Sequence, residues 1–116
     1  MESGKLYDLS TVASIAGGDP AFVKKMAQLF IDTMPKNFDD LNIALQSNDW
    51  VSVGKLAHKM KATIDSMAIV SIQQDIRTLE QNGKNSQSVE TIPTLVEKIT
   101  SVLKQCIADL KKEFGL

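Results

Sequence analysis

The sequence of 116 residues contains a single cysteine, a single histidine and no long apolar run. One cysteine cannot form an intramolecular disulfide, which fits a reducing compartment. No apolar run approaches the roughly 18 residues that a membrane-spanning helix needs. The first residues, Met1-Glu2-Ser3-Gly4-Lys5, show no signal-peptide pattern. We therefore expect a cytoplasmic protein that does not insert into a membrane.

Neither sign of charge is in excess, because thirteen basic and fourteen acidic residues give a net charge of −1. Without a basic excess or a cluster of aromatic and basic residues, we do not expect nucleic-acid binding. Apolar residues make up 43% of the chain, which is ordinary for a globular protein. The length is sufficient for one domain with one core.

Several kinds of active site are also missing from the sequence. There is no Gly-x-x-x-x-Gly-Lys loop for a nucleotide, so we expect neither ATP binding nor autonomous kinase activity. One histidine and one cysteine do not make a zinc site, and no Glu-x-x-His motif supports a di-iron bundle. No serine or cysteine is placed as the nucleophile of a triad with His58. We expect no cofactor in this chain.

The chain is predicted to be all-α, because its apolar residues recur at helical spacing and no segment alternates like a strand. The predicted helices cover about residues 8–16, 20–46, 50–67 and 69–81, and a last helix begins between residues 88 and 92 and ends near residue 114. Residues 1–7 should form a loose lead-in and residues 82–88 a polar loop. Asp8 or Ser10 should cap the first helix, and Asp19 and Asp49 the next two.

Pro35 lies inside the second predicted helix and should kink it, with two separate helices as the lesser alternative. The inner side of this helix is predicted to carry Phe22, Met26, Leu29, Phe30, Thr33, Leu41, Ala44 and Leu45. Ile31, Met34 and Phe38 drift from this stripe, so they belong either to the core or to an exposed apolar patch. Cys106 lies in the apolar stripe of the last helix, which predicts a buried, unreactive thiol.

Four long helices with short connections predict an antiparallel up-down four-helix bundle, capped at one end by the short N-terminal helix. We expect a single domain over residues 1–116, with an ordered core over about residues 8–114. Counting residues from the helix connections places His58 midway along the bundle, level with Phe38 on the second helix and Leu79 on the fourth. A partner would then have room to lie flat across it.

The only histidine lies opposite the apolar stripe of the third predicted helix. That stripe consists of Val53, Leu56, Ala57, Met60, Ile64 and Met67. His58 lies roughly 140–150° from the centre of the stripe on a helical wheel, so it should point to solvent. Its neighbours one turn away are Gly54, Lys55, Lys61 and Ala62, of which two are small and two are cationic.

An open imidazole with two ammonium groups within reach suits a nucleophile that accepts a phosphoryl group and then has its charge screened. Glycine inside a helix costs about 0.8–1 kcal/mol relative to alanine. We therefore interpret Gly54 and Ala62 as clearance for the ring. On this interpretation, Gly54→Leu would keep or raise the melting temperature while blocking a partner. The alternative is an exposed surface histidine without a function.

A longer pattern surrounds the histidine. Its centre is His58-Lys59-Met60-Lys61-Ala62-Thr63, followed by Met67-Ala68-Ile69. Asp19 follows a Gly-Gly pair and precedes a helix with Phe30, Asp49 comes shortly before the histidine helix, and Leu79-Glu80 lies on the next helix. Over about residues 8–114, this pattern resembles the histidine-containing phosphotransfer (HPt) domain. Ala62 departs from it, because the family usually has glycine after the lysine.

The resemblance implies a phosphorelay intermediate. His58 Nε2 would accept a phosphoryl group from the aspartyl phosphate of a receiver domain and pass it to another receiver aspartate. Lys61 would compensate the phosphoryl charge, and Lys55 is a second choice without support from the family. Gly54, Lys55 and Ala62 would form the surface of the site.

The implied partners are response-regulator receiver domains, one of which can belong to a hybrid sensor histidine kinase. Mg²⁺ and most catalytic groups would belong to the receiver, and we expect this chain to be a monomer. A free-standing domain and a domain of a hybrid kinase fit the pattern equally. The alternative function is that of a helical protein-interaction module, a degenerate relative whose His58 is never phosphorylated.

Overall fold

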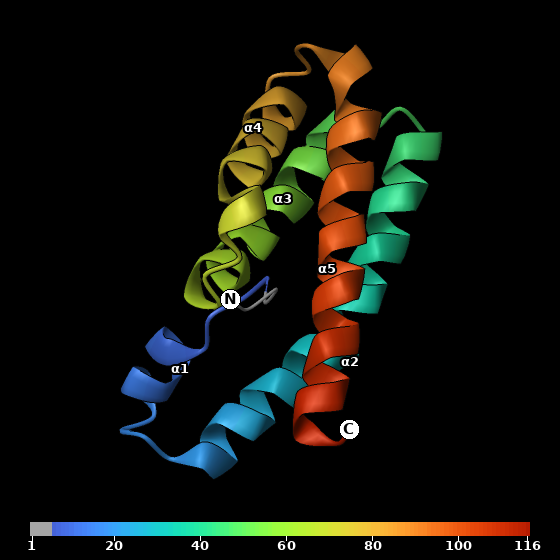
Figure 1. Cartoon of the computed structure of the whole chain (residues 1–116). Helices are drawn as coiled ribbons and strands as arrows, with labels where there is room; N and C mark the ends of the chain where they lie inside the picture. The colour runs from blue at the N-terminus through green and yellow to red at the C-terminus, as the bar shows by residue number, and fades with distance from the viewer. Residues whose placement is uncertain (1–5) are drawn as a thin grey trace.

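A computed structural model describes residues 6–116 of the chain. Its helices are α1 (Ser10–Ile15), α2 (Pro20–Gln46), α3 (Trp50–Ser66), α4 (Gln73–Lys84) and α5 (Ile92–Phe114), with 3₁₀ turns η1 (Val70–Ile72) and η2 (Val89–Thr91) before α4 and α5. The four long helices run alternately up and down, and each packs against two others (Figure 1). The predicted all-α antiparallel bundle with a short N-terminal helix is confirmed.

Side chains cap two of the long helices at the predicted positions. Asp19 Oδ1 accepts a hydrogen bond of 3.0 Å from the amide of Ala21, and Pro20 occupies the first turn of α2. Asp49 accepts hydrogen bonds from both the amide and the hydroxyl of Ser52 at the start of α3. These bonds lower the pKa of Asp49, the hydroxyl contributing most. Local sequence therefore determines where α2 and α3 begin.

Pro35 lies inside α2 without ending it, so the prediction of one kinked helix is confirmed. Figure 1 shows that α2 changes direction along its length. Proline causes such bends because it lacks the amide hydrogen for the carbonyl one turn earlier and its ring crowds that turn. Ile31, Met34 and Phe38 are each at most 8% exposed. They belong to the core and not to an exposed patch.

The first half of α2 is less buried than the sequence predicts. Phe22, Met26 and Leu29 are 37%, 36% and 52% exposed, and Thr33 is exposed as well. The reason is length, because α2 has 27 residues whereas α3 has 17. The first turns of α2 extend past the end of α3 to the place where α1 packs (Figure 1). An apolar stripe that continues beyond the bundle is only partly covered.

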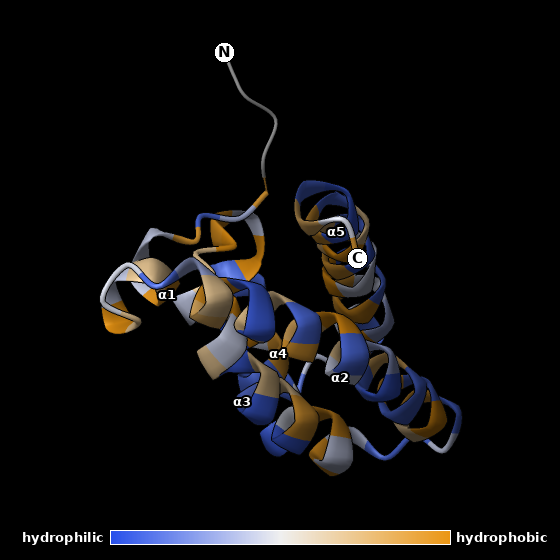
Figure 2. Ribbon diagram, turned by 90° about the horizontal axis from the view of Figure 1, so that it is seen from below, coloured by the Kyte–Doolittle hydropathy of each residue, from blue (hydrophilic) through white to orange (hydrophobic). Residues whose placement is uncertain are grey.

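The four long helices surround one apolar core, which is seen along the bundle in Figure 2. Its fully buried side chains include Leu41, Met60, Leu79 and Leu103, one from each long helix. Cys106 has no exposed surface, and burial raises the pKa of its thiol to about 12. The predicted burial of this cysteine is confirmed. None of the helices in residues 6–116 combines the length and apolar composition of a membrane-spanning segment.

The segment before α1 is anchored to the bundle. Tyr7 is 5% exposed, and its hydroxyl donates a hydrogen bond of 2.7 Å to Glu113 near the end of α5. Asp8 accepts a hydrogen bond from the amide of Ser10 at the start of α1, but the N-cap position belongs to Leu9 and to neither predicted residue. The prediction of a loose lead-in is wrong for Tyr7, because burying an aromatic side chain stabilises the segment. For residues 1–5 that prediction lies outside the described residues.

The connection between α4 and α5 begins later than predicted. Asn82 and Gly83 were expected in a polar loop, but α4 continues to Lys84 and both residues are buried. The side-chain nitrogen of Asn82 donates a hydrogen bond to the Thr91 hydroxyl, and the side-chain oxygen of Asn82 accepts one from the side chain of Gln87. These bonds explain why polar residues that are typical of turns extend the helix here. The last helix begins at Ile92, within the predicted range.

Candidate functional site

His58 lies in the middle of α3, where 70% of its side chain is exposed. The neighbouring helix α4 places Glu80 beside it, with 2.6 Å between His58 Nδ1 and Glu80 Oε2. Both predictions made for His58 are therefore confirmed: the ring faces solvent, and its level on α4 is next to Leu79. The contact is between two helices and does not come from the helical neighbours of His58.

Glu80 also binds Lys61, so one carboxylate joins the two residues that the sequence predicts for the site. Lys61 Nζ lies 2.8 Å from Glu80 Oε1, and the side chains of Lys61 and Glu80 are 30% and 18% exposed. The hydrogen bond from Lys61 is the largest cause that lowers the pKa of Glu80, and the hydrogen bond from His58 lowers it further. Glu80 is therefore ionised at neutral pH.

The contact with Glu80 selects one form of the imidazole ring. An ionised carboxylate can only accept hydrogen bonds, so the hydrogen of a neutral His58 must lie on Nδ1. The lone pair is then on Nε2, on the side of the ring away from Glu80. A ring that is open to solvent, with a free lone pair at Nε2, has the form that a nucleophile needs.

Gly54 does not serve as clearance for the ring, and that interpretation is wrong. Gly54 is buried against α4, and a Cβ atom added to it would lie 2.5 Å from the amide nitrogen of Lys84. A Cβ atom on Gly83 would in turn lie 2.5 Å from the amide nitrogen of Gly54. Each glycine faces the backbone of the other helix. The small size of Gly54 is required by the close approach of α3 and α4.

This close approach lies next to the site. Gly54 is one turn before His58 on α3, and Gly83 is one turn after Glu80 on the antiparallel helix α4. The two glycines therefore determine the distance between the helices where the imidazole meets the carboxylate. The Glu80 side chain can reach Nδ1 of His58 at hydrogen-bond distance because the backbones of α3 and α4 lie close together here.

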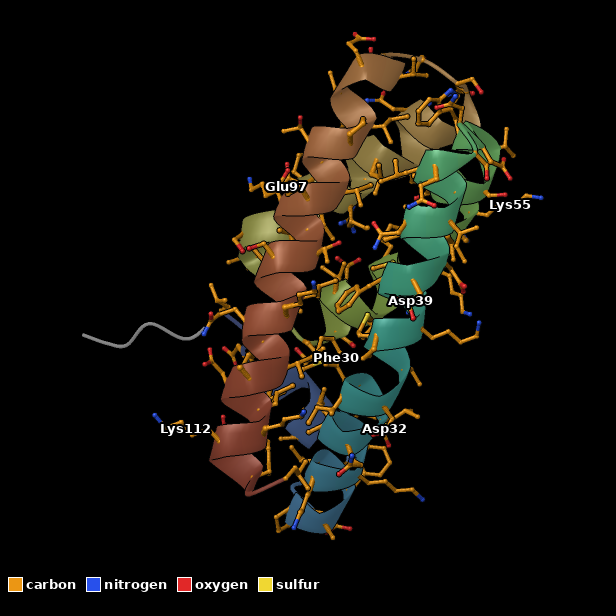
Figure 3. All side chains as sticks on the ribbon, turned by 90° about the vertical axis from the view of Figure 1, so that its right-hand side faces the viewer. Phe30, Asp32, Asp39, Lys55, Glu97 and Lys112 are labelled. Atoms are coloured by element: carbon orange, nitrogen blue, oxygen red, sulfur yellow. The ribbon has the colours of Figure 1, made fainter. Side chains whose placement is uncertain are left out.

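The other predicted surface residues surround His58 without a hydrogen bond to it. Ala62 is exposed one turn after His58, and Lys55 extends into solvent from α3 (Figure 3). Lys55 also borders a hollow of about 320 Å³ between α3 and α4, together with Val51, Gly54, His58, Glu80 and Lys84. Gly54 contributes backbone to this hollow, which is consistent with its burial. Lys61 is thus the one predicted cation that the structure connects to His58, through Glu80.

Sequence reasoning missed Glu80 and Gly83 as parts of the site. Glu80 belongs to the quoted Leu79-Glu80 pair, and residue counting already places Leu79 level with His58, so the two observations together could have identified it. Gly54 and Gly83 are almost equally far along the chain from Ala68, where α3 turns toward α4. The two glycines are not paired in the sequence-based prediction, because Gly83 is predicted to lie in a polar loop.

Residues 6–116 contain no group of three or more histidine, cysteine, aspartate or glutamate side chains that could hold a metal ion. The groups that the described residues bring together at this site are an exposed imidazole, a carboxylate that binds it, and a nearby ammonium group.

The family model of the Hpt domain matches residues 25–113, a range that includes His58, Lys61 and Glu80. The chain belongs to the Hpt domain family. Hpt domains have a phosphotransfer role in two-component signalling and interact with receiver domains of response regulators or hybrid kinases. The comparisons with curated proteins and with solved structures found no match.

Proposed function

We propose that this chain is a phosphorelay intermediate that accepts a phosphoryl group on His58 Nε2 from a receiver aspartyl phosphate and passes it to another receiver aspartate. The observation that supports this most strongly is the exposed imidazole whose Nδ1 is bound by an ionised carboxylate. That arrangement presents Nε2 as the nucleophile. The donor receiver can be part of a response regulator or of a hybrid sensor kinase, and Mg²⁺ would be held by the receiver.

The transfer step requires no proton to move. The Nε2 lone pair forms a bond to phosphorus while the bond between phosphorus and the aspartyl oxygen breaks, and the aspartate leaves as a carboxylate. Nδ1 keeps its hydrogen, so the ring becomes positively charged. Glu80 lies 2.6 Å from Nδ1 and stabilises this charge as it develops. Transfer to the second receiver is the same step in reverse.

Lys61 compensates the charge of the phosphoryl group in this proposal. A phosphoryl group adds about −1.5 to −2 charge near neutral pH, taking phosphoserine as the reference. Lys61 Nζ is already held beside the imidazole by Glu80, and the flexible lysine stem allows the ammonium group to turn toward the new oxygens. Glu80 would keep its bond to Nδ1 when Lys61 leaves it.

Transfer of a labelled phosphoryl group tests the function directly. The full chain is incubated with an isolated receiver domain that carries label on its aspartate, and a second unlabelled receiver is then added. We expect label to appear on this chain and then on the second receiver. If the chain takes no label from any receiver, whether from a response regulator or from a hybrid kinase, the proposal is wrong and the alternative of an unphosphorylated interaction module is favoured.

Lys61→Ala should slow phosphotransfer about tenfold, because the variant loses a charge-assisted interaction with the phosphoryl group. The fold should remain intact, since the Lys61 side chain is 30% exposed and lies at the edge of the bundle. The measurement is a time course of transfer to and from a receiver. Lys59→Ala is the matched control, because Lys59 is exposed on the same helix. Equal rates for the two variants would remove Lys61 from the site.

Glu80→Gln should also slow transfer about tenfold, because a neutral amide stabilises the positive ring less than a carboxylate does. The amide can in addition donate to Nδ1, which favours the tautomer with hydrogen on Nε2 and removes the nucleophilic lone pair. Transfer rates and the tautomer of His58, read from its ¹⁵N chemical shifts, should change together. Glu97→Gln on the outer surface of α5 (Figure 3) is the control. A wild-type rate in Glu80→Gln would contradict this role.

A further inference from the structure

A second ion pair joins α3 and α4 one helical turn beyond the site. Arg77 Nη1 and Nη2 donate hydrogen bonds of 3.1 and 2.6 Å to Asp65 Oδ1 and Oδ2, and Nη1 also donates to the Gln73 carbonyl at 2.9 Å. Both carboxylate oxygens of Asp65 are therefore bound by one guanidinium group. Such bidentate pairs fix the geometry of a carboxylate better than a single hydrogen bond does.

The position of this pair relative to Lys61 suggests a role beyond joining two helices. Asp65 lies one turn after Lys61 on α3, and Arg77 lies one turn before Glu80 on α4. Lys61 therefore has two carboxylates nearby, namely Glu80, which it binds, and Asp65. The pKa of Asp65 is lowered mainly by its hydrogen bond with Arg77, and the charge of Lys61 also lowers it. Lys61 and Asp65 are close enough to attract each other.

The two carboxylates would draw Lys61 in opposite directions. His58 and the phosphoryl group lie toward the N-terminus of α3 from Lys61, whereas Asp65 lies toward the C-terminus. A lysine and an aspartate four residues apart on a helix attract each other, although less in this order than with the acidic residue first. Arg77 weakens this attraction, because it neutralises Asp65 and occupies both of its oxygens.

We propose that Arg77 is a positioning residue for phosphotransfer, which binds Asp65 and thereby keeps Lys61 available to Glu80 and to the phosphoryl group on His58. This inference rests on the proposed function. In this proposal Arg77 acts on Lys61 through Asp65, and its charge also interacts with that of Glu80. This positioning role differs from simple attachment of α3 to α4 in one testable respect. Arg77 is needed for positioning only while the Asp65 carboxylate is present to compete for Lys61.

Three variants of the full chain make that separation: Arg77→Gln, Asp65→Asn and the double variant. Phosphorylation of His58 by phosphoramidate is followed by ³¹P NMR and needs no partner. In that reaction Nε2 forms a bond to phosphorus, the phosphorus–nitrogen bond of the donor breaks, and the nitrogen of the donor, which is protonated before the step, leaves as ammonia. Arg77→Gln should slow phosphorylation about two- to fivefold, the effect expected when one exposed ion pair replaces another. Asp65→Asn and the double variant should react at the wild-type rate, because neither has a carboxylate that competes for Lys61.

The pattern of the three rates decides the matter. If all three variants are slowed equally, the pair only holds the helices together and the proposal is wrong. A wild-type rate in Arg77→Gln would also overturn it. Thermal melts of all three variants verify that the fold is intact, so that a change in rate can be assigned to the position of Lys61. Failure of the proposed function is distinguishable, because the wild-type chain would then take no phosphoryl group on His58, and this inference would fall with it.

Discussion

His58→Gln is expected to abolish phosphorylation of this chain and leave its fold unchanged. Glutamine has no ring nitrogen with a lone pair, so no bond to phosphorus can form at this position. The His58 side chain is 70% exposed, so its shape contributes little to the packing of the bundle. The amide of glutamine can still donate a hydrogen bond to Glu80. We therefore expect a melting temperature close to that of the wild type and no label above background from a labelled receiver.

The chemistry of the labelled product provides an independent check. A phosphorus–nitrogen bond is hydrolysed in acid and survives in base, whereas a phosphoserine ester survives acid. Label on the wild-type chain should therefore be lost on acid treatment. Label that remains on His58→Gln, or acid-stable label on the wild type, would show that another side chain is the nucleophile. The unchanged fold is verified by circular dichroism and by thermal melting of both proteins.

Gly54→Leu is expected to destabilise the bundle by about 3 kcal/mol or more, which lowers the melting temperature by about 10 °C. The first atom of the new side chain would already lie 2.5 Å from the backbone of Lys84 and 3.0 Å from that of Gly83. Backbone atoms within α4 cannot give way singly, so the two helices must separate. Leucine favours a helix more than glycine does, but this preference is much smaller than the cost of the clash.

Urea and thermal unfolding of Gly54→Leu and Ala62→Leu give a matched comparison. Both variants add bulk to α3 one turn from His58, but Gly54 is buried against α4 and Ala62 is exposed. Ala62→Leu should change the stability by no more than about 0.5 kcal/mol. A wild-type melting temperature for Gly54→Leu would show that α3 and α4 do not depend on contact between glycines.

Ala62→Leu should impair phosphotransfer although it hardly changes the stability. Ala62→Leu places a branched side chain beside an exposed imidazole, so transfer from a receiver should fall while the fold stays intact. Phosphorylation by the small donor phosphoramidate should be reduced less, because it needs less space. If Ala62→Leu exchanges phosphoryl groups with a receiver at the wild-type rate, Ala62 does not border the docking surface.

Most of the helical framework could be predicted because its signals are local. Apolar spacing identified the four long helices, and Asp19 and Asp49 marked two helix starts through bonds to amides two or three residues away. The errors occurred where burial depends on another element. Phe22 and Leu29 continue the apolar stripe of α2, but no other helix covers them fully. Asn82 and Gly83 have the composition of a turn, yet contacts with other elements keep them helical.

The sequence by itself determined that His58 is exposed on a helix with Lys61 one turn away, because residues three and four apart share a helix face whatever surrounds it. Only the tertiary structure decided that Glu80 binds both of them and that Gly54 touches α4. Contacts between helices depend on the register of one helix against another, and an error of one turn at a helix end shifts every pair. The exposed position of His58 can therefore be predicted from α3 alone, whereas the groups that contact its ring depend on how α3 and α4 pack.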